Sequence, residues 1–576
     1  MLERCDRLQE MIRIPSAKML LLDGGLFLLL LLCLAIRCTH GLDLSDEMQY
    51  YGQIASLVTH GRLFESDLFV QQLVYLPFYP LFKLHAVVFN QDGLVLFGRT
   101  LLALLLVGLY IYARRWMVSK GATRFQAAVA ALALTFAVPY HGIFAISYNT
   151  IAQLTWAVFL IWFWDWSERS LPRFVALVVL TGFAHPIAAI VMGALISLRF
   201  LLERRTAEFV AWLCWGLAGC AVALCLMSLF TTPEILAKSL TFSRGFGVGA
   251  GLFSRDGKWQ FALLFVGMLL AINAVPARWL AKFAPPWILL TLCWVYALFL
   301  LFGHLYNGYT ASVMQVGGCL VLAALIRLRV TGYAHVSSVR QGLWWLTLGI
   351  CTHFLTLVVT SSNGLGQGVG AVFVALPLLV GVLLPASGIT HSIKKLDASV
   401  GALSISLLSV FIAQWSLYPY RDDRWYTIGS QASWVLAFRY IKTSQNHIEF
   451  LTAFQEKVGN QINGRPALIV SEYPALYFSL NAVPQTCMLY MHSTGSLESA
   501  SVLKQCINQR HPSVLLDVYP EYAYAREGAP IKLLARQYAQ DHKMACKDSD
   551  LDSASAFNRT GMHVKYRLCQ TVYGEP

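Results

Sequence analysis

Residues 42–69 read LDLSDEMQYYGQIASLVTHGRLFESDLF and follow directly on an apolar run from Met19 to Ile36. An apolar run of that length is long enough to cross a bilayer. The stretch after it carries five acids, namely Asp43, Asp46, Glu47, Glu65 and Asp67. An acidic segment directly after a transmembrane helix is either a solvated connector or part of a functional site. The remainder of the sequence has to decide between the two.

The composition indicates a membrane protein. The chain has 576 residues, of which 57% are hydrophobic and 13% are charged, whereas soluble domains carry about 25% charged residues. Apolar runs of roughly 17 to 25 residues, each long enough to span a bilayer, recur through the first 416 positions. The net charge of +13 lies largely in short loops, where basic residues report orientation. It therefore predicts no nucleic-acid partner.

The hydropathy pattern predicts about thirteen transmembrane helices. Basic residues precede the first of them and no small-residue cleavage site follows it, so we expect a signal anchor with a cytoplasmic N-terminus. The predicted spans are 19–36, 94–112, 125–140, 150–164, 174–184, 186–198, 207–230, 260–275, 285–303, 310–326, 343–360, 368–384 and 398–416.

Two of these assignments rest on the positive-inside rule. Residues 73–89 are apolar, but Pro77 and Pro80 break a helix there, and a crossing would place the basic residues that follow outside. We expect this segment to lie along the outer leaflet or dip into it. Residues 174–198 could form one span or two. Two short helices that turn at His185–Pro186 keep ten basic residues inside, so we predict two.

An odd number of spans places the end of the chain on the outer side. We therefore divide it into a cytoplasmic N-terminus (1–18), a transmembrane module (19–416) with a first outer loop at 37–93, and an extracytoplasmic domain (417–576). We expect a multi-pass protein of the cell inner (plasma) membrane whose C-terminal domain is periplasmic.

The last 160 residues have the pattern of a small α/β domain. RPALIVSEYPALYFSL and HPSVLLDVYP each show a short β-branched run before a proline-containing turn, and NHIEFLTAFQEKVGNQI has helical spacing. This part contains Cys487, Cys506, Cys546 and Cys569. In an oxidising compartment they could form disulfides, and spacing alone leaves buried thiols as the alternative.

This layout resembles the GT-C class of glycosyltransferases, which take a sugar from a polyprenyl-phosphate carrier. The layout is similar to that of the bacterial lipid A aminoarabinose transferases and of the protein O-mannosyltransferases. SDEMQYYGQIASLVTHGRLF is similar to the family's first-loop pattern, and YPALYFSLNAVPQT resembles a strand–turn–helix of their C-terminal domains. The Glu-Lys-Pro-Pro context of the family's second first-loop acid has no counterpart, since FESDLFVQQLVYLPFYP stands there.

The resemblance implies sugar transfer from a polyprenyl-phosphate donor to a lipid, glycan or protein acceptor. The acceptor hydroxyl needs a base, for which Asp46 is the candidate. On the local sequence alone Asp46 could instead complement the dipole of a helix capped by Asp43 or Ser45. Asp67 is the candidate second acid, with a solvated turn as its alternative. Glu47 points away from Asp46, so we expect a supporting role and a milder effect of Glu47→Gln.

A leaving phosphate needs cations or N–H donors. The glycine-rich stretch 243–258 supplies Arg244, Arg255 and Lys258, and Lys83 in 73–89 is a rival. His304 and Asn307 could line a sugar pocket. No cluster has the spacing of a zinc site, so we predict no resident metal and no required cofactor. A divalent cation on the acids would be compatible with the resemblance.

Two other functions fit a polytopic chain. A transporter or flippase would show internal repeats and ionisable residues in mid-membrane. We find no repeat, and the two charges inside predicted spans, Asp23 and Arg99, lie near span ends. Another envelope glycan polymerase or ligase would place its large loop late in the chain, whereas the acid-rich loop here comes first.

Overall fold

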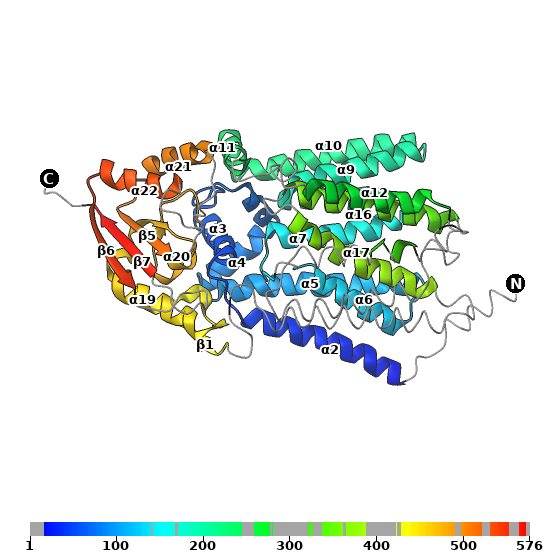
Figure 1. The fold of residues 1–576 in the computed structure, drawn as a ribbon, viewed down its shortest axis with the longest axis horizontal. Helices are drawn as coiled ribbons and strands as arrows, with labels where there is room; N and C mark the ends of the chain where they lie inside the picture. Colours follow the sequence, from blue (N-terminus) through cyan, green and yellow to red (C-terminus); the bar gives the residue numbers. More distant parts are fainter. Residues whose placement is uncertain are drawn as a thin grey trace.

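The computed structural model describes residues 17–139, 142–166, 171–244, 258–276, 279, 321–322, 324–326, 337–360, 365–386, 422, 428–489, 497–520, 530–551 and 564–571. Long helices lie side by side at one end of the molecule, a small α/β domain forms the other end, and α3 (Asp46–His60) and α4 (Tyr79–Phe89) lie between them (Figure 1). We call the end of the helical bundle that meets this domain the domain end.

The bundle consists of apolar helices. Their bounds are Ala17–Thr39 (α2), Leu94–Ser119 (α5), Arg124–Ala137 (α6), Tyr148–Trp164 (α7), Leu171–Ala184 (α8), Pro186–Leu202 (α9), Thr206–Ser228 (α10), Lys258–Ala274 (α12), Ser337–Thr360 (α16) and Leu365–Ala386 (α17). The predicted spans from 19–36 to 260–275, and those at 343–360 and 368–384, fall on these helices. Spans 285–303 and 398–416 lie outside the described residues, as does most of 310–326.

Among the residues that the structure describes, four segments are long and apolar enough to cross a membrane: Val70–Phe89, Leu94–Ser119, Thr206–Ser228 and Gln341–Thr360. Together with the shorter apolar helices they indicate an association with membranes. The count of thirteen spans is not confirmed. The predicted turn at His185–Pro186 is confirmed, because α8 ends at Ala184 and Pro186 begins α9. Nδ1 of His185 caps α9 by accepting from the N–H of Ala188 at 3.2 Å.

Residues 70–89 form two short elements, a 3₁₀ helix at Val70–Phe78 (η1) and α4 at Tyr79–Phe89. Their flanking helices start and end at the same end of the bundle. Arg99, near the beginning of α5, donates to the carbonyl of Arg37 in the last turn of α2, at 3.2 Å, and to that of Gly41 just after this helix, at 2.5 Å. If residues 70–89 crossed the membrane once, the end of α2 and the beginning of α5 would lie on opposite sides of it, and Arg99 could not reach these carbonyls. These hydrogen bonds therefore favour the predicted position of 73–89 along one leaflet, although length and composition alone would permit a span.

The predicted α/β domain is present. Its mixed sheet has the order β4-β3-β5-β7-β6, formed by Pro466–Val470 (β3), Val483–Pro484 (β4), Val514–Pro520 (β5), Ala545–Leu551 (β6) and Val564–Gln570 (β7). β3 runs parallel to β4 and β5, while β7 is antiparallel to β5 and β6. The helices are Gln445–Ile462 (α19), Ala475–Ser479 (α20), Leu497–Arg510 (α21) and Pro530–Asp541 (α22). A two-stranded ribbon, Ser430–Gln431 (β1) and Lys442–Thr443 (β2), with a 3₁₀ turn at Leu436–Phe438 (η6), precedes them.

Both pairs of cysteines in this domain form disulfides. Cys546 and Cys569 lie directly opposite each other on β6 and β7. Cys487 joins Cys506 of α21. Of the two alternatives that spacing left open, the structure thus has the disulfides.

The domain is fastened to the stretch 41–93 by hydrogen bonds and ion pairs. The N–H of Leu42 donates to Asp422 at 2.8 Å, and the N–H of Leu68 donates to the carbonyl of Cys487 at 2.8 Å. Arg510 pairs with Glu65 at 2.8 Å and Arg439 with Asp92 at 2.6 Å. Ala475, at the start of α20, donates to the carbonyl of Leu44 at 3.2 Å. The acidic stretch is therefore enclosed between bundle and domain.

Candidate functional site

The acidic stretch begins with a capped helix, α3 (Asp46–His60). Ser45 occupies the N-cap position, yet the capping acceptor is Asp43. The carboxylate of Asp43 accepts from the N–H of Ser45 at 3.0 Å and from that of Glu47 at 2.9 Å. Since free N–H groups at a helix start need acceptors, Asp43 fixes where α3 begins.

Glu47 forms a buried ion pair. Its two oxygens accept from Nε and Nη2 of Arg99, each at 2.7 Å, and the exposed fractions of the two side chains are 2% and 3%. Arg99 also donates to a carbonyl in the last turn of α2 and to one just after it, so one guanidinium joins α2, α3 and α5. This bidentate geometry is the strong form of the pair. Glu47 thus has a structural role, and its negative charge balances the buried cation of Arg99.

Asp67 is completely buried beside α3. Its Oδ2 accepts from Nε2 of Gln49 and of Gln53, both at 2.9 Å. Its Oδ1 accepts from the N–H of Phe69 at 3.0 Å. Burial raises the pKa of Asp67 to about 6, although the N–H groups that donate to it act in the opposite direction. The solvated-turn alternative is wrong, because Asp67 has no exposed surface. The carboxylate ties the loop to α3.

Asp46 is the acid of this stretch that combines partial exposure with a place on the polar face of α3. Gln49 and Gln53 follow it by three and seven residues, so all three lie on one face of the helix. Asp67, held by both glutamines, therefore lies on the same face as Asp46, roughly one to two turns away.

Aromatic side chains border this face. Tyr148, the first residue of α7, lies close enough to Asp46 for electrostatic interaction and packs edge-on against Tyr50, with ring centroids 6.3 Å apart. Farther along, the hydroxyl of Tyr75 donates to Oε1 of Gln53 at 3.1 Å. The arrangement is a polar strip at the domain end, open at Asp46 and closed at Asp67. A partly exposed carboxylate beside aromatic rings can take a proton from a bound hydroxyl.

Lys83 lies elsewhere on this helix pair. Its Nζ donates to the carbonyl of Val58 at 2.9 Å, near the far end of α3. Val58 follows Asp46 by twelve residues, which is about 18 Å along the helix. Lys83 is exposed on α4 among exposed apolar side chains that include Leu84 and Val87. The structure therefore does not bring Lys83 next to Asp46, but places it at an apolar surface.

The other proposed cation site begins near Asp67. Residues 233–244 form α11 (Pro233–Arg244), whose Ser243 accepts from the N–H of Val70 at 3.0 Å. Phe242 packs against Phe69, with ring centroids 5.2 Å apart. Arg244, the last residue of α11, thus follows directly on a contact with the segment after Asp67. Lys258 begins α12. Arg255, His304 and Asn307 lie outside the described residues.

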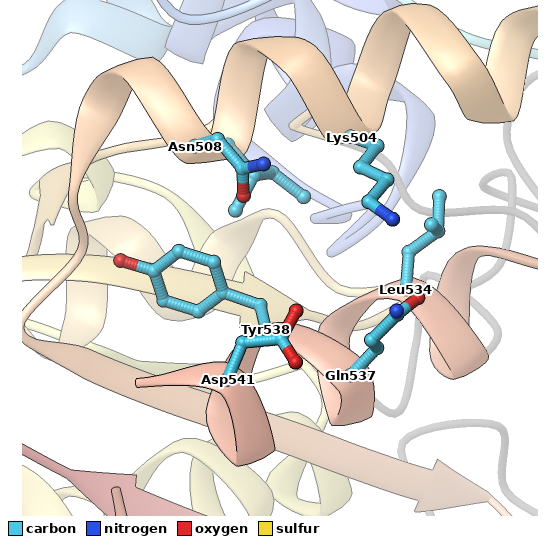
Figure 2. Close-up of a pocket in the computed structure, with 7 residues that line it drawn as sticks. Lys504, Asn508, Leu534, Gln537, Tyr538 and Asp541 are labelled. Carbon is cyan, nitrogen blue, oxygen red and sulfur yellow. The ribbon is translucent and has the colours of Figure 1, made fainter. Parts of the chain in front are cut away.

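A small pocket lies in the C-terminal domain, between α21 and α22, and Lys504, Asn508, Tyr538 and Asp541 are among the residues that line it (Figure 2). It contains none of the predicted site residues. Within the described ranges, no group of three or more His, Cys, Asp or Glu side chains is placed to hold a metal ion.

Sequence reasoning missed the partners of the acids. Arg99 was noted only as a charge inside a predicted span, although a buried arginine there requires a carboxylate or carbonyl partner. Gln49 and Gln53 carry the spacing of one helix face with Asp46, and that signal could have identified them. No local sequence pattern predicted that Tyr75 would contact Gln53.

Comparison with known proteins gives no further assignment. No protein-family model matches the chain, and no curated protein or solved structure matches it significantly.

Proposed function

We propose that this protein is an integral membrane glycosyltransferase, which transfers a sugar from a polyprenyl-phosphate donor to an acceptor on the extracytoplasmic face. The observation that carries the proposal is the position of Asp46. It is a partly exposed acid at the domain end of the bundle, near Tyr50 and Tyr148. The acids Asp43, Glu47, Glu65 and Asp67 all hold the loop together.

In the proposed reaction, the acceptor hydroxyl oxygen attacks the anomeric carbon of the donor while the bond from that carbon to the phosphate oxygen breaks. Asp46 takes the proton of the hydroxyl, and the polyprenyl phosphate leaves with its negative charge. No general acid is needed, because a phosphate is a good leaving group. Cations stabilise it instead, and for these we propose Arg244, Arg255 and Lys258.

Asp67 has a positioning part in this proposal. Its oxygens are engaged by Gln49, Gln53 and Phe69, so it contacts protein groups rather than substrate. It holds α3 against the loop and thereby fixes the direction in which Asp46 points. Preorganisation of this kind matters, because a small misplacement of a catalytic group costs much of the rate.

The lipid part of the donor would reach the site along α4. Leu81, Leu84, Val87, Val88 and Phe89 are exposed on this helix, which lies next to α3 (Figure 1). In a membrane such a surface faces lipid chains. Lys83 on the same helix could meet a lipid phosphate at that surface. No cofactor is part of the proposal, and a divalent cation is accommodated as a component of the donor complex.

The proposal is tested by mass spectrometry of envelope glycolipids and glycans from cells with and without the gene. We expect one glycan or glycolipid to lose a sugar residue in cells that lack the gene, and the polyprenyl-phosphate sugar to accumulate. Unchanged glycans together with an altered distribution of a solute or lipid across the membrane would favour a transporter or flippase instead.

A further inference from the structure

Helices α7 and α16 bury three polar side chains where they pack against each other. Gln153 and Trp156 belong to α7 and His353 to α16, and their exposed fractions are 1%, 1% and 0%. The rings of Trp156 and His353 stack, with centroids 4.6 Å apart and an interplanar angle of 17°. Gln153 precedes Trp156 by three residues, so both lie on the same face of α7. We call these residues the α7–α16 cluster.

The polar atoms of this cluster have no hydrogen-bond partner in the part of the chain that the structure describes. They are both amide atoms of Gln153, Nε1 of Trp156 and both ring nitrogens of His353. Five buried polar atoms without a partner at one helix contact are unusual, because native proteins pair nearly all such groups with protein atoms or ordered water. Apolar side chains at these three positions would avoid the free-energy cost of burying unpaired polar atoms. We therefore expect a bound group to supply the missing hydrogen bonds.

The cluster lies a short way inside the domain end. His353 precedes the last residue of α16, Thr360, by seven positions, which is about 10 Å along the helix. At that end the hydroxyl of Thr360 forms a hydrogen bond with Nε2 of His185, at 3.0 Å. His185 and His353 are near enough to interact electrostatically. Polar groups therefore follow one another from the end of α16 to the cluster.

The chemistry of the cluster suits hydroxyl groups. A glutamine amide donates and accepts, a neutral imidazole carries one donor and one acceptor, and an indole N–H donates. A hydroxyl also donates and accepts, so it can satisfy several of these atoms at once. The cluster includes no carboxylate, lysine or arginine, so it is not built to bind an ion of either sign.

We propose that the α7–α16 cluster is an internal hydroxyl-binding site, occupied by ordered water or by the hydroxyls of a saccharide. The geometry of Gln153, Trp156 and His353 carries this inference, and it does not depend on whether Asp46 is a catalytic base.

The test is hydroxyl-radical labelling of the purified full-length protein by radiolysis of water, read out by mass spectrometry. Radicals made from a bound water oxidise the side chains next to it even where bulk solvent has no access. Each rate is divided by the rate of the same residue in the unfolded chain. Phe163 of α7 and Phe174 of α8, both fully buried, are the matched controls. We expect Trp156 and His353 to be oxidised well above both controls. Rates equal to those of the controls would overturn the proposal.

A second arm distinguishes the two occupants. Labelling is repeated with added D-glucose, with the radical dose matched by a reporter dye. Protection of Trp156 and His353 would identify saccharide hydroxyls as the occupant, whereas unchanged labelling would identify water. In Gln153→Leu, which removes two of the five polar atoms, we expect oxidation of Trp156 to fall to the level of Phe163. Should that variant fail to fold, the wild-type comparison still decides.

Discussion

The buried pair of Glu47 and Arg99 gives a prediction whose size follows from its geometry. Glu47→Gln keeps the shape of the side chain and one acceptor oxygen but removes the negative charge. Arg99 then remains as a cation that is 3% exposed, with backbone carbonyls and one neutral amide oxygen as acceptors but no negative charge beside it. Removal of one partner from a buried ion pair costs about 3–5 kcal/mol, because the other charge stays buried without compensation.

Glu65→Gln is the matched control. Glu65 is an acid of the same stretch, and it pairs with Arg510 at 2.8 Å where the side chains are 23% and 29% exposed. Loss of such a partly exposed pair costs about 0–1 kcal/mol. We therefore expect thermal unfolding of the purified protein in detergent to show a loss of Tm for Glu47→Gln several times larger than for Glu65→Gln.

A double-mutant cycle completes this experiment. Arg99→Met removes the cation, so Glu47→Gln should cost much less in that background than in the wild type. Residues in direct contact commonly show a coupling of about 0.5–3 kcal/mol. Equal losses of Tm for Glu47→Gln and Glu65→Gln, together with additive effects in the cycle, would refute the reasoning. The expectation that Glu47→Gln affects activity less than Asp46→Asn stays a prediction, whereas the buried ion pair predicts a large loss of stability for the same change.

Three further outcomes follow from the structure. The pKa of Asp67 is raised from 3.8 to about 6, so the folded state binds this proton more tightly than the unfolded state. The free energy of unfolding should therefore fall by roughly 3 kcal/mol as pH rises from about 4 through 6. In Asp67→Asn, Tm should depend less on pH over this window. Gly98→Ala should destabilise the protein by about 1–3 kcal/mol, since a Cβ there would lie 2.6 Å from Tyr51, whereas Gly108→Ala on the same helix has free space and should be neutral in thermal unfolding. Peptide mapping without reductant should recover the linked peptides of both disulfides, and four freely alkylated thiols would contradict their presence.

Local signals in the sequence predicted the elements that depend on local chemistry. The two prolines at 77 and 80 mark the break between η1 and α4, and His185–Pro186 marks the turn between α8 and α9. The β-branched runs before proline became β3 and β5, because such side chains fit the pleated surface of a buried sheet.

The partners within the site could not be predicted in the same way. Glu47 and Arg99 are 52 residues apart and Asp67 lies 18 residues from Gln49, so these contacts exist only once the helices have packed. The choice among the acids depends on burial, which hydropathy windows do not resolve at single residues. Asp67 and Asp46 look alike in the sequence, yet the structure buries one completely and leaves the other partly exposed.

The central claim is that the carboxylate of Asp46 takes the proton of the acceptor hydroxyl. The most direct test is the rate of sugar transfer in membranes that contain Asp46→Asn, supplied with a labelled polyprenyl-phosphate sugar, with Glu65→Gln as the control. Asparagine keeps the size of the side chain but cannot accept a proton at neutral pH. We expect a normally folded protein whose rate falls by about 10²- to 10⁴-fold, while Glu65→Gln keeps most of its activity. Transfer by Asp46→Asn at the wild-type rate would contradict the claim.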